Sequence, residues 1–314
     1  MLNKNVCILG GGGFVGRHLA SQLAARGWRI TVPARQRQRA KDLLVLPGIE
    51  VVQTDVHDPE VLARLCAGQD AVINLVGILH GSERAFTAAH VELPAKAMAA
   101  CQAAGVRRFL HMSALGADPA SRSLYQRSKG EGERRVLDLG RQYGIDVTVF
   151  RPSVIFGPGD SFLTLFAGLL GMAPVVPLAN AGTRFQPVHV VDVARAFADA
   201  VGDPESHGQA YNLCGPEVYN LAQLVGLVAA TLGLKRLILP LGAGASYWFA
   251  RAMELKPGTK LMTRDNHYAM QTDNVCPDGF PARFGQPRGL AASLDYLRGG
   301  RQDQYDGYRT VAGR

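Results

Sequence analysis

The sequence predicts an α/β protein built on a doubly wound parallel sheet, with a smaller, mostly helical C-terminal lobe. Short apolar runs alternate with amphipathic stretches through the first half of the chain, as in a parallel sheet covered on both faces. A glycine-rich turn follows the first apolar run, and the alternation changes after Arg151. We expect right-handed crossovers, and ligands bound at the carboxyl ends of the strands.

The elements of the first half follow from the spacing of their apolar residues. This spacing predicts strands over 6–9, 30–32, 50–53, 71–76, 109–113 and 147–151. It also predicts helices that include Val15–Arg26 and Phe86–Ala104. Gly130, Gly132 and Gly140 fall in a further predicted helix, which either packs closely on a neighbour or is short or bent.

The second half contains an uncharged run of 18 residues, Phe162–Ala179, interrupted by two prolines and two glycines. We interpret it as a buried or interfacial helix followed by a turn, with a membrane-spanning helix as the alternative. Beyond it, the pattern predicts a strand over Arg184–Val191 and a helix that Asp192 caps. Helices are expected over Leu221–Leu232 and Ser246–Leu255.

The composition is that of a folded globular chain, with 47% hydrophobic and 19% charged residues and no glycine period. The net charge is +8, and the one dense basic run covers residues 35–41. Nucleic-acid sites usually show a longer basic stripe with interleaved aromatic residues. We therefore expect no nucleic-acid partner, and an anionic small molecule at the basic run instead.

The five cysteines are odd in number and far apart, and they contain no Cys-x-x-Cys. This spacing argues against a zinc site and against a disulfide framework. It favours a reduced cytoplasm. The first apolar run leads directly into a glycine turn, which is not the pattern of a secretory signal, so we expect a cytoplasmic protein without bound metal.

The strongest motif is the turn Gly10–Gly16, which reads Gly-Gly-Gly-Gly-Phe-Val-Gly between a predicted strand and a predicted helix. Glycine allows positive φ and close approach of the backbone, and a helix N-terminus favours an anion. This context predicts a dinucleotide pyrophosphate, with a purely structural turn as the alternative. The residues expected to meet the cofactor here are Gly10, Gly13, Phe14, Val15 and Gly16.

Cofactor specificity is expected at the end of the second strand. An NAD site usually offers an acidic residue there for the ribose 2′-hydroxyl, but this chain has Arg35 and Arg37. Because guanidinium binds a phosphate in bidentate fashion, we expect NADP(H) rather than NAD(H), a solvated basic loop being the alternative. Adenine and ribose contacts are expected where the third and fourth strands end, at Asp55, Val56, Leu75, Val76 and Gly77.

Tyr125 and Lys129 form a Tyr-x-x-x-Lys motif, and four-residue spacing places both side chains on one helix face. A nearby ammonium is expected to lower the pKa of the phenol, which suits it to acid–base catalysis. Lys129 also suits the ribose hydroxyls. Ser113 ends the fifth strand and is expected to hold a substrate carbonyl beside Tyr125. The alternative is that the three residues are structural.

These motifs assign residues 1–155 to a Rossmann dinucleotide-binding domain, to which 183–214 returns. A smaller substrate or partner lobe takes 156–182 and 215–298, and 299–314 is expected to be a mobile tail. The lobe is rich in Phe, Leu, Tyr and Trp. These residues either line an apolar cleft for a quinone or isoprenoid, contact a membrane surface, or form an ordinary helical core.

Together these residues resemble the short-chain dehydrogenase/reductase superfamily, extended type. Over His111–Asp118, Tyr125–Glu133 and Asp273–Val275 the chain is similar to the atypical subgroup of an accessory subunit of mitochondrial respiratory complex I, which has stand-alone bacterial relatives. The resemblance implies bound NADPH, a Rossmann core and a link to quinone or respiratory biology. It also implies a loop that passes the nicotinamide, at Pro152, Ser153 and Val154.

One departure from the family pattern is His90, which stands where extended reductases usually carry an asparagine of the proton relay. It either replaces that asparagine or is a hydrogen-bonded core histidine. His189 is expected to pack or cap rather than catalyse. Arg151 either anchors the cofactor or pairs within its loop.

Three functions are compatible with the sequence. The first is an NADPH-dependent oxidoreductase acting on an apolar carbonyl or a quinone- or isoprenoid-like compound. The second is a non-catalytic NADPH-binding structural or assembly protein, bound to a respiratory-chain protein or peripheral to the inner face of the membrane. The third is an NAD-dependent sugar-nucleotide epimerase or dehydratase.

Overall fold

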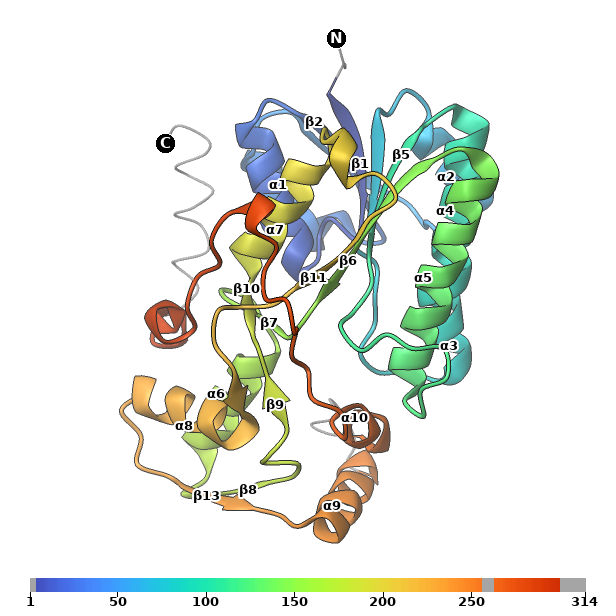
Figure 1. The fold of residues 1–314 in the computed structure, drawn as a ribbon. Helices are drawn as coiled ribbons and strands as arrows, with labels where there is room; N and C mark the ends of the chain where they lie inside the picture. The colour runs from blue at the N-terminus through green and yellow to red at the C-terminus, as the bar shows by residue number, and fades with distance from the viewer. Residues whose placement is uncertain (1–3, 256–262, 300–314) are drawn as a thin grey trace.

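The computed structural model describes residues 4–255 and 263–299, and a seven-stranded parallel sheet forms its centre (Figure 1). The strand order is β11-β6-β5-β4-β1-β2-β3. The strands are β1 (Asn5–Leu9), β2 (Arg29–Ala34), β3 (Ile49–Gln53), β4 (Ala71–Asn74), β5 (Arg108–Met112), β6 (Asp146–Pro152) and β11 (Ala210–Leu213). The order reverses between β1 and β4, so the ligand-binding switch point lies at the carboxyl ends of these two strands.

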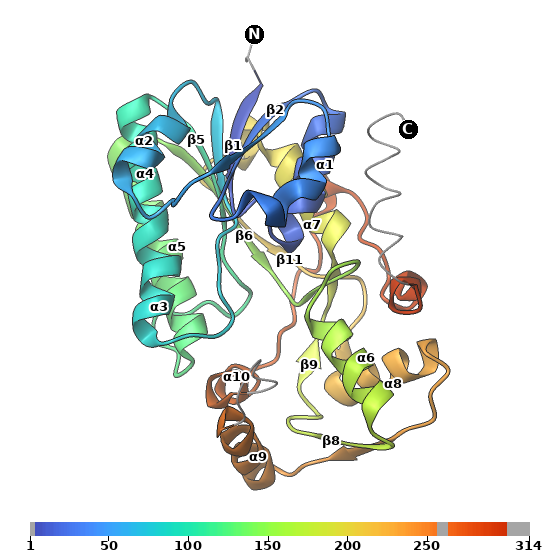
Figure 2. The same ribbon diagram turned by 180° about the vertical axis from the view of Figure 1, so that it is seen from behind.

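The doubly wound fold is therefore confirmed, and all six strands predicted in the first half of the chain are present. Helices cover both faces of the sheet (Figures 1 and 2). One face carries α1 (Phe14–Ala25) and α7 (Val190–Ala200), and the other carries α2 (Pro59–Cys66), α4 (Leu93–Ala104) and α5 (Leu124–Tyr143). Side chains alternate along β1, so that Ile8 packs in the first layer and Leu9 in the second.

The predicted helix over Phe86–Ala104 is divided into three parts. α3 (Glu83–Thr87) leads into a single π-helical turn (Ala88–Glu92), which leads into α4. The buried His90 lies inside the π turn. Isolated π turns within helices frequently occur at functional sites.

The second lobe has its own apolar core, which includes Phe156, Leu163 and Leu224. Its elements are β7 (Ile155–Phe156), α6 (Phe162–Met172), β8 (Val175–Leu178), β9 (Arg184–Phe185), β12 (Tyr219–Asn220), α8 (Leu221–Thr231), β13 (Leu237–Pro240), α9 (Ala243–Leu255) and α10 (Arg264–Ala269). Along the chain as a whole, 3₁₀ helices cover Arg37–Val45, Pro204–Ser206, Ala282–Phe284, Ala291–Ser293 and Asp295–Leu297. Residues 300–314 of the expected mobile tail lie outside the described residues.

The helix expected within the uncharged run is confirmed as α6, which β8 follows in place of a turn. The alternative of a membrane-spanning helix is not met, because no helix within 4–255 or 263–299 is long and apolar enough to cross a membrane. Two other expectations for the second half, a strand and a helix cap, are wrong. The strand expected over Arg184–Val191 is two short strands, β9 and β10 (Val188–His189), after which α7 begins at Val190. The cap of α7 is His189, whose Nδ1 accepts a hydrogen bond from Val191 N at 3.3 Å, rather than Asp192.

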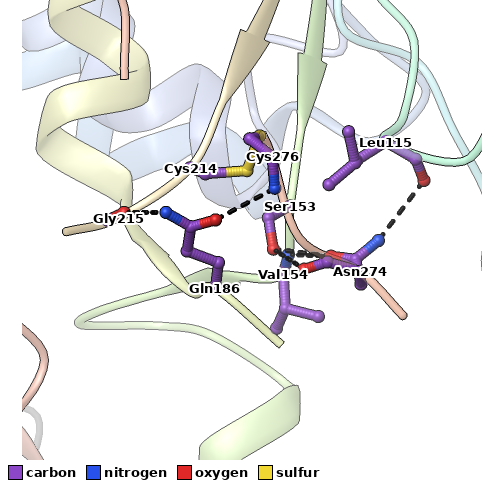
Figure 3. Close-up of a disulfide and its surroundings, with 8 residues drawn as sticks. All are labelled: Leu115, Ser153, Val154, Gln186, Cys214, Gly215, Asn274 and Cys276. Atoms are coloured by element: carbon purple, nitrogen blue, oxygen red, sulfur yellow. Dashed lines mark hydrogen bonds between the residues drawn. A yellow bond between two sulfur atoms is a disulfide. The ribbon is translucent and has the colours of Figure 1, made fainter. Parts of the chain in front are cut away.

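The cysteine spacing argues against a disulfide framework, but the described residues contain one disulfide. Cys214, at the end of β11, is bonded to Cys276, 62 residues further along the chain (Figure 3). The C-terminal segment crosses back over the sheet edge and brings the two sulfurs together, which spacing alone does not reveal. Cys7, Cys66 and Cys101 are free and buried.

Candidate active site

The glycine turn forms a backbone cradle at the switch point. Gly10 has φ +83°, and a Cβ there would lie 3.1 Å from Val76 N in the loop after β4. A Cβ at Gly16 would lie 2.5 Å from Gly10 O and Gly11 Cα. The N-cap of α1 is Gly13, which has no side chain to cap the first N–H groups. These groups suit the pyrophosphate of a dinucleotide, so the turn fits the expected cofactor.

The other expected cofactor residues lie where the sequence placed them along the strands. Arg35 and Arg37 follow β2 and are exposed, and neither forms an ion pair within 4–255 and 263–299. Asp55 follows β3, and its Oδ1 accepts from His57 N at 3.0 Å in a local turn. Leu75 follows β4 and donates its backbone N–H to Leu9 O at 2.9 Å, which joins this loop to the end of β1.

Ser113 follows β5 and is 2% exposed. Its Oγ is buried and has no hydrogen-bond partner in the described part of the chain. Because buried hydroxyls are almost always hydrogen-bonded, this oxygen is available for an atom of a ligand. The observation fits the expected role of Ser113 in holding a substrate oxygen.

Tyr125 and Lys129 lie in the first two turns of α5. The half-buried Tyr125 ring packs edge-on against Phe86 and His90, with centroids 6.3 and 5.6 Å away. Burial raises the pKa of Tyr125 to about 12, so the expected lowering by Lys129 is wrong for the protein without ligands. Burial also lowers the pKa of Lys129 to about 8, opposed by the nearby Glu133, and Lys129 Nζ donates to Met112 O at 2.9 Å.

His90 connects the loop after β4 to the helix that carries Tyr125. Its Nε2 accepts from Ile78 N at 3.0 Å, so Nδ1 carries the proton and donates to Ser128 Oγ at 2.8 Å. Ser128 Oγ in turn donates to Tyr125 O at 3.0 Å. Burial, followed by the charge of Lys129, lowers the pKa of His90 to about 3. This geometry is that of a neutral, hydrogen-bonded core histidine.

The π turn around His90 lies directly against α5. A Cβ at Gly132 would lie 1.9 Å from His90 O, so only glycine permits this approach. Cβ atoms at Gly130 and Gly140 would likewise lie within 2.6 Å of neighbouring atoms. The glycines of α5 are therefore explained by close packing against neighbouring elements. The alternative of a short helix does not apply, because α5 is 20 residues long.

A second buried histidine, His111, escaped the sequence-based site assignment. The oxygen of Asn74 accepts from Val76 N at 3.2 Å, so the Asn74 amide donates to His111 Nδ1 at 3.1 Å. His111 Nε2–H is then a buried donor without a partner in the described residues. Burial lowers the pKa of His111 to about 3. The signal that could have found this pair is that two predicted strands carry Asn74 and His111 near their ends. These two residues lie opposite each other in the parallel pairing of β4 with β5.

Two residues from the C-terminal part of the chain hold the site in place. Asp265 of α10 accepts hydrogen bonds at the N-terminus of α5, from Leu124 N at 2.5 Å and Tyr125 N at 3.2 Å. Asn274 Oδ1 accepts from Ser153 Oγ at 2.5 Å and from Val154 N at 3.2 Å (Figure 3). Both contacts join residues more than 100 positions apart, so no local pattern predicts them, and Asn274 was noted only as part of the resemblance over Asp273–Val275.

Arg151 has a structural partner rather than a free guanidinium. Its Nε donates to both carboxylate oxygens of Glu133 on α5, each at 3.0 Å. Arg151 is therefore paired, but its partner lies on α5 and not within its own loop as expected. The pair joins β6 to the helix that carries Tyr125.

The glycine cradle, the Tyr-x-x-x-Lys helix and the buried serine at a sheet switch point define a pyridine-nucleotide-binding protein of the extended short-chain dehydrogenase/reductase class. The chain belongs to the NAD dependent epimerase/dehydratase family, whose model matches residues 6–214.

Known proteins of two kinds are similar to this chain. NADH dehydrogenase (ubiquinone) 1 alpha subcomplex subunit 9, mitochondrial, of Mus musculus is 30% identical over 281 residues, which cover 87% of this chain and 73% of that protein. Ceramide reductase of Caulobacter vibrioides is 29% identical over 307 residues, covering 93% and 94%. The structure of DesIV (dTDP-glucose 4,6-dehydratase) from Streptomyces venezuelae has a TM-score of 0.73 at 20% identity, covering 95% of this chain and 98% of that one. This last likeness concerns the fold.

Proposed function

We propose that the protein is an NADP(H)-dependent oxidoreductase that acts on the carbonyl of an apolar substrate. The observation that carries the proposal is the buried Ser113 Oγ, which has no hydrogen-bond partner within 4–255 and 263–299 and lies at a strand end of a site that also contains Tyr125 and Lys129. Such a hydroxyl suits a hydrogen bond to a substrate oxygen. When bound, NADPH supplies the hydride.

In this proposal the chain supplies binding and a proton. Ser113 Oγ donates to the carbonyl oxygen and orients it. Tyr125, whose pKa of about 12 keeps the phenol protonated at neutral pH, gives its proton to that oxygen. The Lys129 ammonium favours the phenolate that remains.

The preference for NADP(H) rests on Arg35 and Arg37. Both are exposed at the end of β2, and a 2′-phosphate would give their guanidinium groups an anionic partner. The apolar substrate is supported by the similarity to ceramide reductase, which is named for a lipid. Within the second lobe, Leu163 and Phe166 are part of the core, which leaves the half-buried Phe162 and Tyr247 as candidates for substrate contact.

The test is consumption of NADPH with a panel of quinones and long-chain ketones. Tyr125→Phe is expected to slow turnover 10²- to 10⁴-fold, roughly the contribution of general acid catalysis. Tyr143→Phe, which removes a hydroxyl at the far end of the same helix, is the matched control and keeps the wild-type rate. Equal rates for wild type and Tyr125→Phe would refute the proposed chemistry.

A second candidate is a non-catalytic NADPH-binding subunit. It is favoured by the similarity to the complex I subunit and by the neutral His90, fully hydrogen-bonded where a relay residue is expected. It predicts that NADPH raises the melting temperature while no carbonyl compound oxidises it. Turnover at an ordinary enzymatic rate would exclude this candidate.

A further inference from the structure

The second lobe carries an exposed apolar surface that neither the cofactor site nor the lobe core uses. β8 and β13 form a two-stranded parallel sheet in which Leu237 lies opposite Val175 and Leu239 opposite Pro177. The alternate residues Val176 and Leu178 point into the lobe core. We call Val175, Pro177, Leu237 and Leu239 the β8–β13 face.

This face is apolar where a strand pair at the surface normally carries polar residues. Leu237 is 61% exposed, Leu239 49% and Val175 43%, and Pro177 is exposed as well. Met172, at the end of α6 and three residues before Val175, is 78% exposed. Contiguous exposed apolar residues of this kind indicate a surface that contacts another molecule or a membrane.

The charged residues next to the face are cations, and the nearest carboxylate on α9, Glu254, is paired with Arg251 and Arg264. Residues 161–183 and 218–253 contain no Asp or Glu, and their only charged residues are Lys235, Arg236 and Arg251. Lys235 and Arg236 directly precede Leu237. Lys235 is exposed, and the Arg236 guanidinium donates to Leu170 O and Lys235 O and forms no ion pair within the described ranges.

The position of the face suits a flat partner. β8, β13 and the start of α9 lie at the end of the molecule opposite the N-terminus, in both views (Figures 1 and 2). α9 is held beside β8, because Asn180 N donates to Ser246 Oγ at 3.3 Å. α9 also carries Trp248, which is 70% exposed. An exposed aromatic residue, aliphatic residues and cations at one end are the elements of an interfacial lipid contact.

We propose that the β8–β13 face docks the protein on the surface of a lipid bilayer that carries anionic headgroups. The aliphatic side chains enter the region between headgroups and acyl chains, and Lys235 and Arg236 meet the negative surface. A protein interface usually has a polar rim of mixed charge, whereas the charged residues that adjoin β13 in the sequence, Lys235 and Arg236, are both cations. The docking does not require turnover at the cofactor site.

The test is co-sedimentation of the full chain with phosphatidylcholine vesicles, with and without 30 mol% phosphatidylglycerol (roughly the anionic content at which polybasic segments bind). The wild type is expected to partition at least tenfold more strongly onto the anionic vesicles, and salt is expected to weaken the binding. Leu237→Asn with Leu239→Asn should abolish it, and Lys235→Glu should reduce it severalfold. Because these side chains point outward, far-ultraviolet circular dichroism and NADPH binding should remain unchanged.

Matched controls separate this face from other surfaces. Leu44→Asn with Val45→Asn changes two exposed apolar residues of the first domain, and Lys41→Glu reverses an exposed charge there. Both are expected to bind vesicles as the wild type does. Three results would overturn the proposal: no vesicle binding, equal loss in the controls, or a wild-type dimer in light scattering that the Leu237/Leu239 variant dissociates. The last would assign the face to a second copy of the chain.

Discussion

The neutral state of His90 has a consequence for acid stability that a single substitution isolates. The ring accepts from Ile78 N and donates to Ser128 Oγ, so the folded protein holds it unprotonated, with a pKa near 3 against an ordinary 6.5. Between pH 6.5 and pH 3, His90 therefore binds a proton in the unfolded chain but not in the native protein. The stability that this histidine contributes is complete above pH 6.5 and is lost as the pH falls toward 3.

The magnitude follows from linkage. Each pH unit below the ordinary pKa lowers the free energy of unfolding by about 1.4 kcal/mol for one such histidine. In His90→Gln this contribution is absent, whereas the loss of one of two buried hydrogen bonds lowers stability by roughly 1–3 kcal/mol at every pH. The stability deficit of the variant should consequently shrink by about 2 kcal/mol between pH 6 and pH 4.5.

The assay is urea unfolding at half-unit pH steps, with the free energy extrapolated to water. Measuring the difference between variant and wild type removes the contributions of the other buried histidines, which include His111 and His189. His57→Gln, a substitution of an exposed histidine, controls for the chemical change itself. A deficit that stays constant across this range would show that His90 is not held neutral, and the hydrogen-bond assignment would be wrong.

Three further predictions concern packing, cofactor choice and the disulfide. Gly132→Ala should destabilise the protein by about 3 kcal/mol in urea unfolding because its Cβ would meet His90 O, whereas Gly168→Ala, with open space around it, should be neutral or stabilising. Arg35→Ala should raise the Kd of NADPH at least tenfold in calorimetry and leave that of NADH unchanged. Replacing Cys214 and Cys276 by serine should lower the free energy of unfolding by about 4 kcal/mol, the entropic value for a loop of this length.

Each of these three predictions would be contradicted by a specific result. An alanine at Gly132 that leaves stability unchanged would mean that α5 and the π turn lie further apart than described. Equal affinity of Arg35→Ala for NADPH would remove the argument for a 2′-phosphate. A serine pair as stable as the oxidised wild type would mean that the disulfide does not constrain the unfolded chain.

The sequence predicted the fold well because its strand and glycine signals are local. Each of these elements is predicted from residues that are close together in the sequence. This holds for the six strands, for the turn at Gly10–Gly16 and for the helix with Tyr125 and Lys129. The short strands β9 and β10 were missed because a pattern of four to eight residues does not resolve two-residue pairings. The π turn was missed because its apolar spacing resembles that of a continuous helix.

The parts of the site that escaped prediction depend on long-range contacts. Asp265 and Asn274 reach the site from the C-terminal segment, and Cys214 meets Cys276 across 62 positions. None of these pairings leaves a local pattern in the sequence. The expected lowering of the Tyr125 pKa failed for a different reason, since burial of the phenol dominates in the folded protein. Spacing indicates that a lysine is near, but it does not indicate how much water the ring loses.

The central claim is that the chain reduces a carbonyl with a proton from Tyr125. The most direct measurement is transfer of deuterium from NADPH labelled at the nicotinamide C4 to an apolar ketone, followed by mass spectrometry of the product. We expect deuterium at the new carbinol carbon with the wild type, and at least a hundredfold less product with Tyr125→Phe. Label in the product at equal rates from both proteins, or in neither, would contradict the claim.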